Sequence, residues 1–206
     1  MNFNQKIQLK VGNMLNPTPV VMVSCGETPD EYNIITVAWT GTLCSDPPMC
    51  YISVRPERHS YAILKERKQF VINLVNEPLA AATDWCGVRS GKKYNKFFET
   101  NLTPIRGNVV KAPMIYESPV NLECEVTDIV SLGSHNMLAE NITIKRIIGS
   151  CGGHALNPNT GSMQQNSIQM AVFATYIYTK FCNIYYFTHN KKIMSDTATQ
   201  CLWPSV

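Results

Sequence analysis

The sequence of 206 residues lacks the short motifs that mark several common enzyme classes. It contains no G-x-G-x-x-G, no G-x-x-x-x-G-K-S/T, no G-x-S-x-G and no H-E-x-x-H. These motifs form phosphate-binding loops, present an activated serine or pair two zinc-binding histidines. A Rossmann dehydrogenase, a P-loop kinase and a self-contained hydrolase are therefore not supported.

Charge and long apolar runs are also scarce. Charged residues make up 16% of the chain, against about 25% in a typical soluble domain. The 18 basic and 15 acidic residues leave a net charge of +3, which is too small and too mixed in sign to indicate a nucleic-acid partner. No apolar run approaches the roughly 20 residues of a membrane span, and the N-terminus lacks the apolar stretch of a secretory signal. We therefore expect a cytoplasmic protein with no membrane partner.

Cysteine is abundant, but its spacing does not indicate a metal site. The eight cysteines form no C-x-x-C pair, and the four histidines are scattered, so a zinc site is only weakly supported. Without a secretory signal, a disulfide framework is not expected either. We predict reduced thiols, most of them small buried apolar residues.

Residues 1–150 are predicted to form an antiparallel β domain with short helices. Alternation and β-branched runs predict strands at 19–25, 33–42, 49–56, 69–75, 120–132 and 136–148. The last two are expected to pair through a turn at Gly133-Ser134. Helices are predicted at 61–68 after a Ser60 cap, at 77–86 between an Asn76 cap and Gly87, and at 92–99 after Ser90 or Gly91. Strands at this spacing favour a closed barrel.

Two basic segments suit a flat, polar, phosphorylated ligand. Arg55, Arg58, His59 and Ser60 stand at the start of the first predicted helix, and a helix N-terminus beside arginine is an anion-binding arrangement. The segment from Arg89 to Lys96 is also basic and precedes a helix. A solvated basic face would give the same pattern. Asn73, a polar residue within an apolar strand, is equally explained by a solvent-facing position.

The order of the segments resembles a known family. N-I-I-T-V-A-W-T-G-T-L-C-S-D-P-P, I-S-V-R-P-E-R-H-S-Y, F-V-I-N-L, D-W-C-G-V-R-S-G-K-K-Y-N-K-F, A-P-M-I-Y-E-S-P-V-N-L-E-C and G-S-H follow one another between residues 19 and 148. This series resembles the flavin reductase-like family, in particular its flavoredoxin-type branch. The resemblance implies a mainly β fold, a Greek-key split β-barrel with short helices. It also implies a homodimer that binds FMN non-covalently near the subunit interface.

The resemblance further implies which residues contact FMN. They are Thr36, Val37, Ala38 and Trp39 along the ring and ribityl chain, Cys44 and Ser45 beside the ring, Arg55, His59 and Ser60 near the phosphate or ribityl hydroxyls, Ser90, Gly91 and Lys96 at the phosphate, and Asn73 in the F-V-x-N strand.

The implied function is that of an FMN-binding oxidoreductase, in which the flavin carries hydride or electrons. NAD(P)H or another reduced donor would supply them, to a small-molecule or protein redox partner. No catalytic residue is predicted, because the flavin would carry the chemistry and the chain shows no obvious catalytic dyad. No metal ligand is predicted either, because the cysteines and histidines lack metal-site spacing. Cys44 is interpreted as a small residue against the ring, with a redox thiol as the alternative. A non-catalytic FMN electron carrier remains the second functional hypothesis.

The pattern changes near residue 149. Residues 1–150 hold 15 basic and 14 acidic residues, whereas residues 151–206 hold three basic and one acidic. Capping signals and alternation also fade there, and the resemblance ends. We hypothesise that 151–206 is an atypical C-terminal tail, partly disordered and produced by a frameshift, which weakens FMN binding and dimerisation. A lineage-specific extension is the alternative, and reading the coding DNA in its other frames near codon 149 separates the two.

Overall fold

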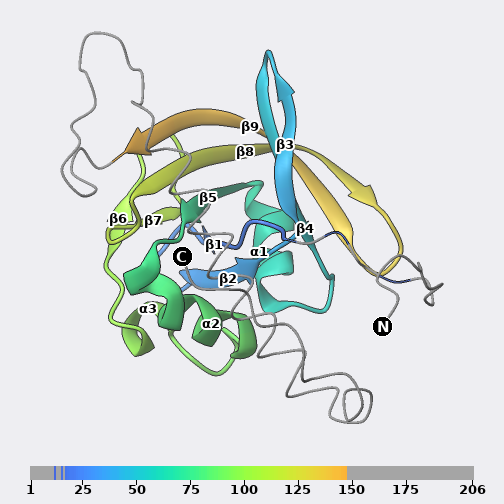
Figure 1. The fold of residues 1–206 in the computed structure, drawn as a ribbon. Helices are drawn as coiled ribbons and strands as arrows, with labels where there is room; N and C mark the ends of the chain where they lie inside the picture. The colour runs from blue at the N-terminus through green and yellow to red at the C-terminus, as the bar shows by residue number, and fades with distance from the viewer. Residues whose placement is uncertain (1–11, 13–14, 16, 148–206) are drawn as a thin grey trace, which may run out of the picture.

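The computed structural model describes residues 12, 15 and 17–147, and within them the fold is mainly β (Figure 1). The strands are β1 (Val21–Cys25), β2 (Asn33–Val37), β3 (Thr40–Ser45), β4 (Pro48–Val54), β5 (Gln69–Leu74), β6 (Pro104–Arg106), β7 (Pro113–Ile115), β8 (Val120–Ser131) and β9 (Asn136–Ile147). The helices are α1 (His59–Arg67), α2 (Ala80–Val88) and α3 (Lys96–Glu99), and a 3₁₀ turn, η1 (Glu77–Leu79), precedes α2.

The main sheet curls because its two edges are joined by a very short link. Its strands are antiparallel in the order β2-β1-β5-β8-β9-β4-β3, so β2 and β3 stand at opposite edges. Only Ala38 and Trp39 separate them in sequence. Seven flat strands about 4.8 Å apart would put the edges roughly 29 Å from each other, whereas a link of two residues, which spans three Cα–Cα steps, reaches about 10–11 Å. The sheet therefore bends into an antiparallel half-barrel. This agrees with the mainly β fold that the resemblance implied, and differs from the closed barrel that the strand spacing favoured.

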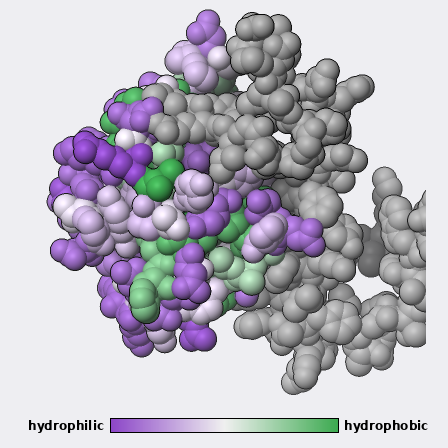
Figure 2. Space-filling model, turned by 90° about the vertical axis from the view of Figure 1, so that its left-hand side faces the viewer, coloured by the Kyte–Doolittle hydropathy of each residue, from purple (hydrophilic) through white to green (hydrophobic). Residues whose placement is uncertain are grey.

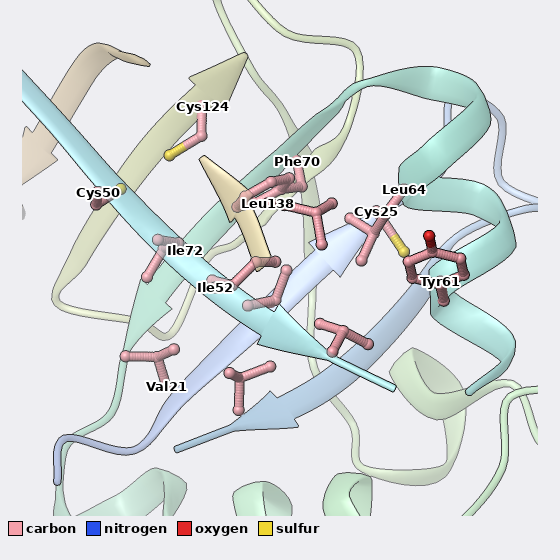
Figure 3. Packing of buried hydrophobic residues seen from close by; sticks show 13 residues of the cluster. Val21, Cys25, Cys50, Ile52, Tyr61, Leu64, Phe70, Ile72, Cys124 and Leu138 are labelled. Atoms are coloured by element: carbon pink, nitrogen blue, oxygen red, sulfur yellow. The ribbon is translucent and has the colours of Figure 1, made fainter. Parts of the chain in front are cut away.

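The inner face of the half-barrel holds the main core. Val21, Val23 and Cys25 alternate along β1 and face inward with buried residues of β4, β5, β8 and β9. Tyr61 and Leu64 of α1 join this cluster, so α1 covers one end of the barrel (Figure 3).

A second core lies on the outer face of β1 and β2. Met22 and Ile34 pack there against η1, α2 and α3, together with Phe97 and Ile115. β1 is buried on both faces, so its sequence, V-M-V-S-C, shows no alternation of apolar and charged residues. On the side of the molecule shown in Figure 2, hydrophilic side chains predominate and hydrophobic ones gather in a few patches.

The hairpin of β8 and β9 has the predicted pairing but a different environment. Its strands pair around the Gly133 turn. Apolar and polar residues alternate along β8, which is typical of a strand with one solvent-facing side, yet its polar residues Asn121 and Glu123 are buried. The loop before β7 covers this face, and Glu123 accepts hydrogen bonds from the backbone N–H groups of residues 108–110. The Glu123 carboxylate thus hydrogen-bonds to backbone N–H groups of this loop, and not to solvent.

The other corrections concern boundaries. The segment 33–42, predicted as one strand, is interrupted at Ala38-Trp39 and forms β2 and the first part of β3. Helix α1 begins at His59, so Ser60 lies in its first turn and is not the cap. Asn76 does cap the next segment, because its Oδ1 accepts from the Leu79 N–H at 3.3 Å. That helix continues through Gly87 to Val88.

The third predicted helix, 92–99, is shorter than expected. It is reduced to α3 after an Asn95 cap, because residues 91–93 form a turn. The short β6–β7 sheet was not predicted. Within the described residues no helix is long and apolar enough to cross a membrane. The predicted tail 151–206 lies outside these residues, and its frameshift origin stays a prediction.

Candidate functional site

The start of α1 is an exposed source of positive potential. Arg58 is the N-cap residue, and its side chain makes no capping hydrogen bond. The first turn contains no acidic residue. The leading N–H groups of a helix have no intrahelical acceptor and carry the positive end of the helix dipole. An anion placed there meets these groups and Arg58 together.

The turn after α2 packs closely against this helix start. A Cβ atom on Gly91 would lie 2.2 Å from Asn33 Oδ1 and 2.9 Å from His59 Cδ2. Only glycine therefore lets the turn approach both side chains. The Asn33 Nδ2 donates to Ser60 Oγ at 2.7 Å, which links β2 to the first turn of α1. Strand, helix and turn thus meet at one point.

These elements surround a small cleft that is partly open to solvent. Its lining comes from the edge strand β2, the start of α1, the end of α2 and the turn that follows. The lining residues include Asn33, Arg58, His59, Arg89, Gly91 and Lys96. Ser60 and Ser90 also line it, so five of the predicted contacts meet there: His59, Ser60, Ser90, Gly91 and Lys96.

Lys96 is the buried cation of the cleft, with an exposed fraction of 3%. Its Nζ donates to the carbonyl oxygens of Ile34 at 2.6 Å and Cys86 at 2.7 Å. Burial lowers the Lys96 pKa. An ammonium group has three protons to donate, and the described residues supply acceptors for two. The third proton is available to a ligand in the cleft.

The cations of the cleft have no acidic partners within the described part of the chain. The ion pairs found there join Arg67 to Glu31 and Glu66, and Lys111 to Glu27. Glu57 lines the cleft without forming an ion pair. Burial, with Lys92 and Lys96 adding to it, lowers the pKa of His59. The uncompensated charge favours an anionic ligand.

The backbone of β2 offers a second kind of contact. β2 is an edge strand, and the Lys96 bond shows that the Ile34 carbonyl points away from β1. Residues two apart in a strand direct their N–H and C=O groups to the same side, so those of Thr36 share this open edge. The Thr36 hydroxyl itself donates to the Thr83 carbonyl at 2.5 Å. Val37 packs in the barrel core. The side chains of Thr36 and Val37, both predicted to contact FMN, therefore make contacts within the protein.

Trp39 and Arg55 belong to a different group. The Trp39 ring lies 4.2 Å from the His135 ring, centroid to centroid. Arg55 Nε donates to His135 Nε2 at 3.3 Å. Neither residue lines the cleft. The structure therefore separates Arg55 from His59 and Ser60, which the sequence grouped together, and joins it to the turn between β8 and β9.

Three more predicted contacts also lie apart from the cleft. Cys44 and Ser45 are at the end of β3, where the Cys44 thiol donates to the Asp46 carbonyl at 3.3 Å. Asn73 is fully buried, which excludes the solvent-facing alternative. Its amide connects β1, β7 and β8 through the Met22 carbonyl, the Ile115 N–H and Asn121. These bonds give Asn73 a structural role.

Sequence reasoning missed Asn33, Ile35, Cys86 and Gly87, which also line the cleft. Asn33 stands at the start of a strand, where a polar residue is ordinary. Its role depends on the approach of Gly91 and Ser60, which are far away in sequence. The sequence signal for the turn after α2 was the R-S-G segment, residues 89–91, and its first residue, Arg89, also lines the cleft.

The residues present fit the phosphate end of FMN. The helix start, Arg58, Arg89 and the open proton of Lys96 are all donors or cations, as phosphate binding requires. The free edge of β2 provides backbone groups beside them. The structure is thus a curled β half-barrel with a cleft at the edge of its sheet, and the lining of this cleft includes Arg58, Arg89 and Lys96.

Comparison with known proteins identifies the family to which the chain belongs. A family model described as a flavin reductase-like domain matches residues 14–153, and the chain belongs to this family. An uncharacterized protein of Archaeoglobus fulgidus is 30% identical over 113 residues, which is 55% of this chain and 64% of that protein. The chain thus spans slightly less than two thirds of that relative.

Solved structures agree with the family. Flavoredoxin of Desulfovibrio vulgaris is similar with a TM-score of 0.67 and 28% identity, covering 71% of this chain and 79% of that one. The FMN-binding protein from Thermus thermophilus has a TM-score of 0.61 at 17% identity, with coverage of 70% and 79%. The second likeness shows the fold alone. The predicted family and the predicted split-barrel fold are confirmed.

Proposed function

We propose that this protein is an FMN-binding oxidoreductase of the flavin reductase or flavoredoxin type. The observation that carries the proposal is the cluster of Arg58, Arg89 and Lys96 beside the start of α1 in a flavin reductase-like fold. None of the three forms an ion pair with another residue in the described part of the chain. FMN supplies hydride and electron chemistry when it is bound. The chain supplies binding and orientation.

Each part of the cleft has a definite task in this proposal. Arg58, Arg89 and the α1 N–H groups hold the phosphate, and Lys96 directs its third proton toward it. The backbone edge of β2 at Ile34 and Thr36 runs beside the ribityl chain and ring. Trp39 and Cys44 lie further along the same chain segment, and the proposal retains them as ring neighbours.

The phosphate assignment is tested by comparing FMN with riboflavin, which lacks the phosphate. Quenching of flavin fluorescence gives both dissociation constants. Arg58→Ala removes one charge-assisted contact, worth about 1.5–3 kcal/mol, so FMN binding should weaken by roughly 10–150-fold while riboflavin binding stays unchanged. The matched control is Arg106→Ala, an exposed arginine on β6. An equal loss for both flavins, or a loss in the control, would contradict the assignment.

Activity separates the two functional candidates. Oxidation of NADH or NADPH by the FMN-loaded protein, above the rate of free FMN, identifies a reductase. FMN that stays bound with no such oxidation identifies an electron carrier for a partner protein.

A homodimer is part of the proposal. Trp39, Leu43 and Leu132 are exposed apolar residues. Trp39 contacts His135, whose carbonyl accepts from the Leu132 N–H, so Trp39 and Leu132 stand close together. Light scattering of the purified chain checks the dimer, and a monomer mass would remove it from the proposal.

A further inference from the structure

A second polar cluster lies inside the barrel, away from the cleft. Cys50 on β4 is paired directly with Glu140 on β9, and Cys124 comes from β8 on the other side of β9. The two sulfur atoms and a Glu140 carboxyl oxygen all lie within 4.8 Å of one another. Figure 3 shows both cysteines at the end of the core away from Tyr61 of α1. Among the described residues, this is the group with metal-ligand spacing.

The carboxyl group of Glu140 is incompletely satisfied. The side chain is fully buried, and its Oε1 accepts a long 3.5 Å contact from the Cys50 thiol. Its Oε2 has no hydrogen-bond partner among residues 17–147. Burial raises the Glu140 pKa to about 11. A buried polar atom without a partner in a native core requires a reason, and a bound ion or water is among the usual ones.

The donor atoms match a thiophilic divalent cation. Two thiolates and one carboxylate are ligands that Zn²⁺ accepts, in tetrahedral geometry. Zn–S and Zn–O bonds of about 2.3 and 2.0–2.2 Å place a sulfur and an oxygen ligand about 3.5 Å apart. The Cys50–Glu140 separation is 3.5 Å. The net charge of Zn²⁺ with these three anions is −1, equal to that of a Cys₃His zinc site.

We propose that Cys50, Cys124 and Glu140 bind Zn²⁺ or a similar thiophilic cation inside the barrel. The ion joins β4, β9 and β8, adjacent strands of the sheet. Binding releases the protons of both thiols and the carboxyl group, and the unpartnered oxygen of Glu140 becomes a ligand. Cys50 is 6% exposed whereas Cys124 and Glu140 are 0% exposed, so the ion enters from the side of Cys50. The site is independent of FMN.

Cobalt reports directly on thiolate ligands. The full chain is reduced, freed of metal by a chelator and titrated with Co²⁺, and then with Zn²⁺ in competition. We expect a thiolate-to-cobalt charge-transfer band that saturates at one equivalent and is abolished by Zn²⁺. Cys50→Ser and Cys124→Ser should lose the band, and the nearly isosteric Glu140→Gln should weaken binding by more than roughly tenfold.

Two controls keep the result specific. Cys25→Ser changes a buried thiol of the same core that is not among the proposed ligands. A variant with serine at Cys151, Cys182 and Cys201 removes the cysteines beyond residue 147. Both should keep the band.

Several outcomes would overturn the proposal. They are the absence of a band at one equivalent, its persistence in Cys50→Ser or Cys124→Ser, and its loss in either control. A Cys50–Cys124 disulfide combined with no Co²⁺ binding after reduction would also overturn it. Thermal melting provides a second test if the cysteine variants fold poorly. Zn²⁺ should raise the melting temperature of the wild type and leave that of Glu140→Gln nearly unchanged.

Discussion

Asn73 offers the sharpest separation of a structural role from a cofactor role. Its Nδ2 donates to the Met22 carbonyl at 3.0 Å, and its Oδ1 accepts from the Ile115 N–H at 3.0 Å and from Asn121 Nδ2 at 2.8 Å. In Asn73→Leu a side chain of similar volume remains. The groups that lose a partner inside the core are the Ile115 N–H, one Asn121 proton, the Ser24 hydroxyl oxygen, and the carbonyls of Met22 and Val71.

The expected loss follows from the number of stranded groups. An unsatisfied buried donor or acceptor costs about 1–3 kcal/mol. Asn121 Nδ2 keeps its bond to the Ile115 carbonyl, and leucine recovers apolar burial of about 1.5–3 kcal/mol. We therefore expect a net loss of about 2–4 kcal/mol in the free energy of unfolding. Native domains have about 5–15 kcal/mol, so most of the protein should remain folded.

Urea denaturation followed by tryptophan fluorescence measures this loss, and FMN titration of the folded variant measures the cofactor role. The structural account predicts a lower midpoint with an FMN affinity changed by less than about twofold, because Asn73 does not line the cleft. An unchanged midpoint with FMN binding weakened more than roughly tenfold would refute the reasoning and restore the assignment made from sequence.

Two further predictions concern the cleft. Gly91→Ala should weaken FMN binding by roughly tenfold, because its Cβ would lie 2.2 Å from Asn33 Oδ1 and overpacking costs about 1–3 kcal/mol. The control is Gly12→Ala, where a Cβ meets nothing within 4 Å. Equal effects of the two substitutions would contradict the explanation. The His59 pKa is lowered by burial and by Lys92, so the unfolded chain takes up this proton first as the pH falls. The free energy of unfolding should therefore decrease as the pH falls below the ordinary histidine pKa of about 6.5. Urea midpoints measured above and below pH 6.5 should show a smaller decrease in His59→Gln than in the wild type. Identical pH profiles of the two proteins would count against this prediction.

The strands could be predicted from the sequence because their signals are local. Alternation defined the β8–β9 hairpin, and apolar runs defined β1 and β5. The burial of Glu123 could not be predicted in this way. Its environment depends on a loop at residues 107–112 that folds back over β8, and alternation carries no information about what covers the polar face.

The candidate site was predictable in part for a similar reason. His59 and Ser60 were found because cations at a helix start have a local signature, and Gly91 because the resemblance covered its segment. Asn33 was missed, since its importance arises from a close contact with Gly91 across the fold. Arg55 was grouped with His59 because they are near in sequence. The backbone turns between them, and Arg55 reaches His135 instead.

Buried polar residues in this fold divide into two kinds, and only one kind indicates a ligand. The amide oxygen and nitrogen of Asn73 both have partners in the core, and Glu123 accepts from successive backbone N–H groups. Lys96 and Glu140 are as deeply buried. The described residues provide two acceptors for the three protons of the Lys96 ammonium group, and none of them bonds Glu140 Oε2. Burying a polar group lowers stability unless it is satisfied. The open group is therefore the feature for which a bound anion, at Lys96, or a bound cation, at Glu140, provides a physical reason.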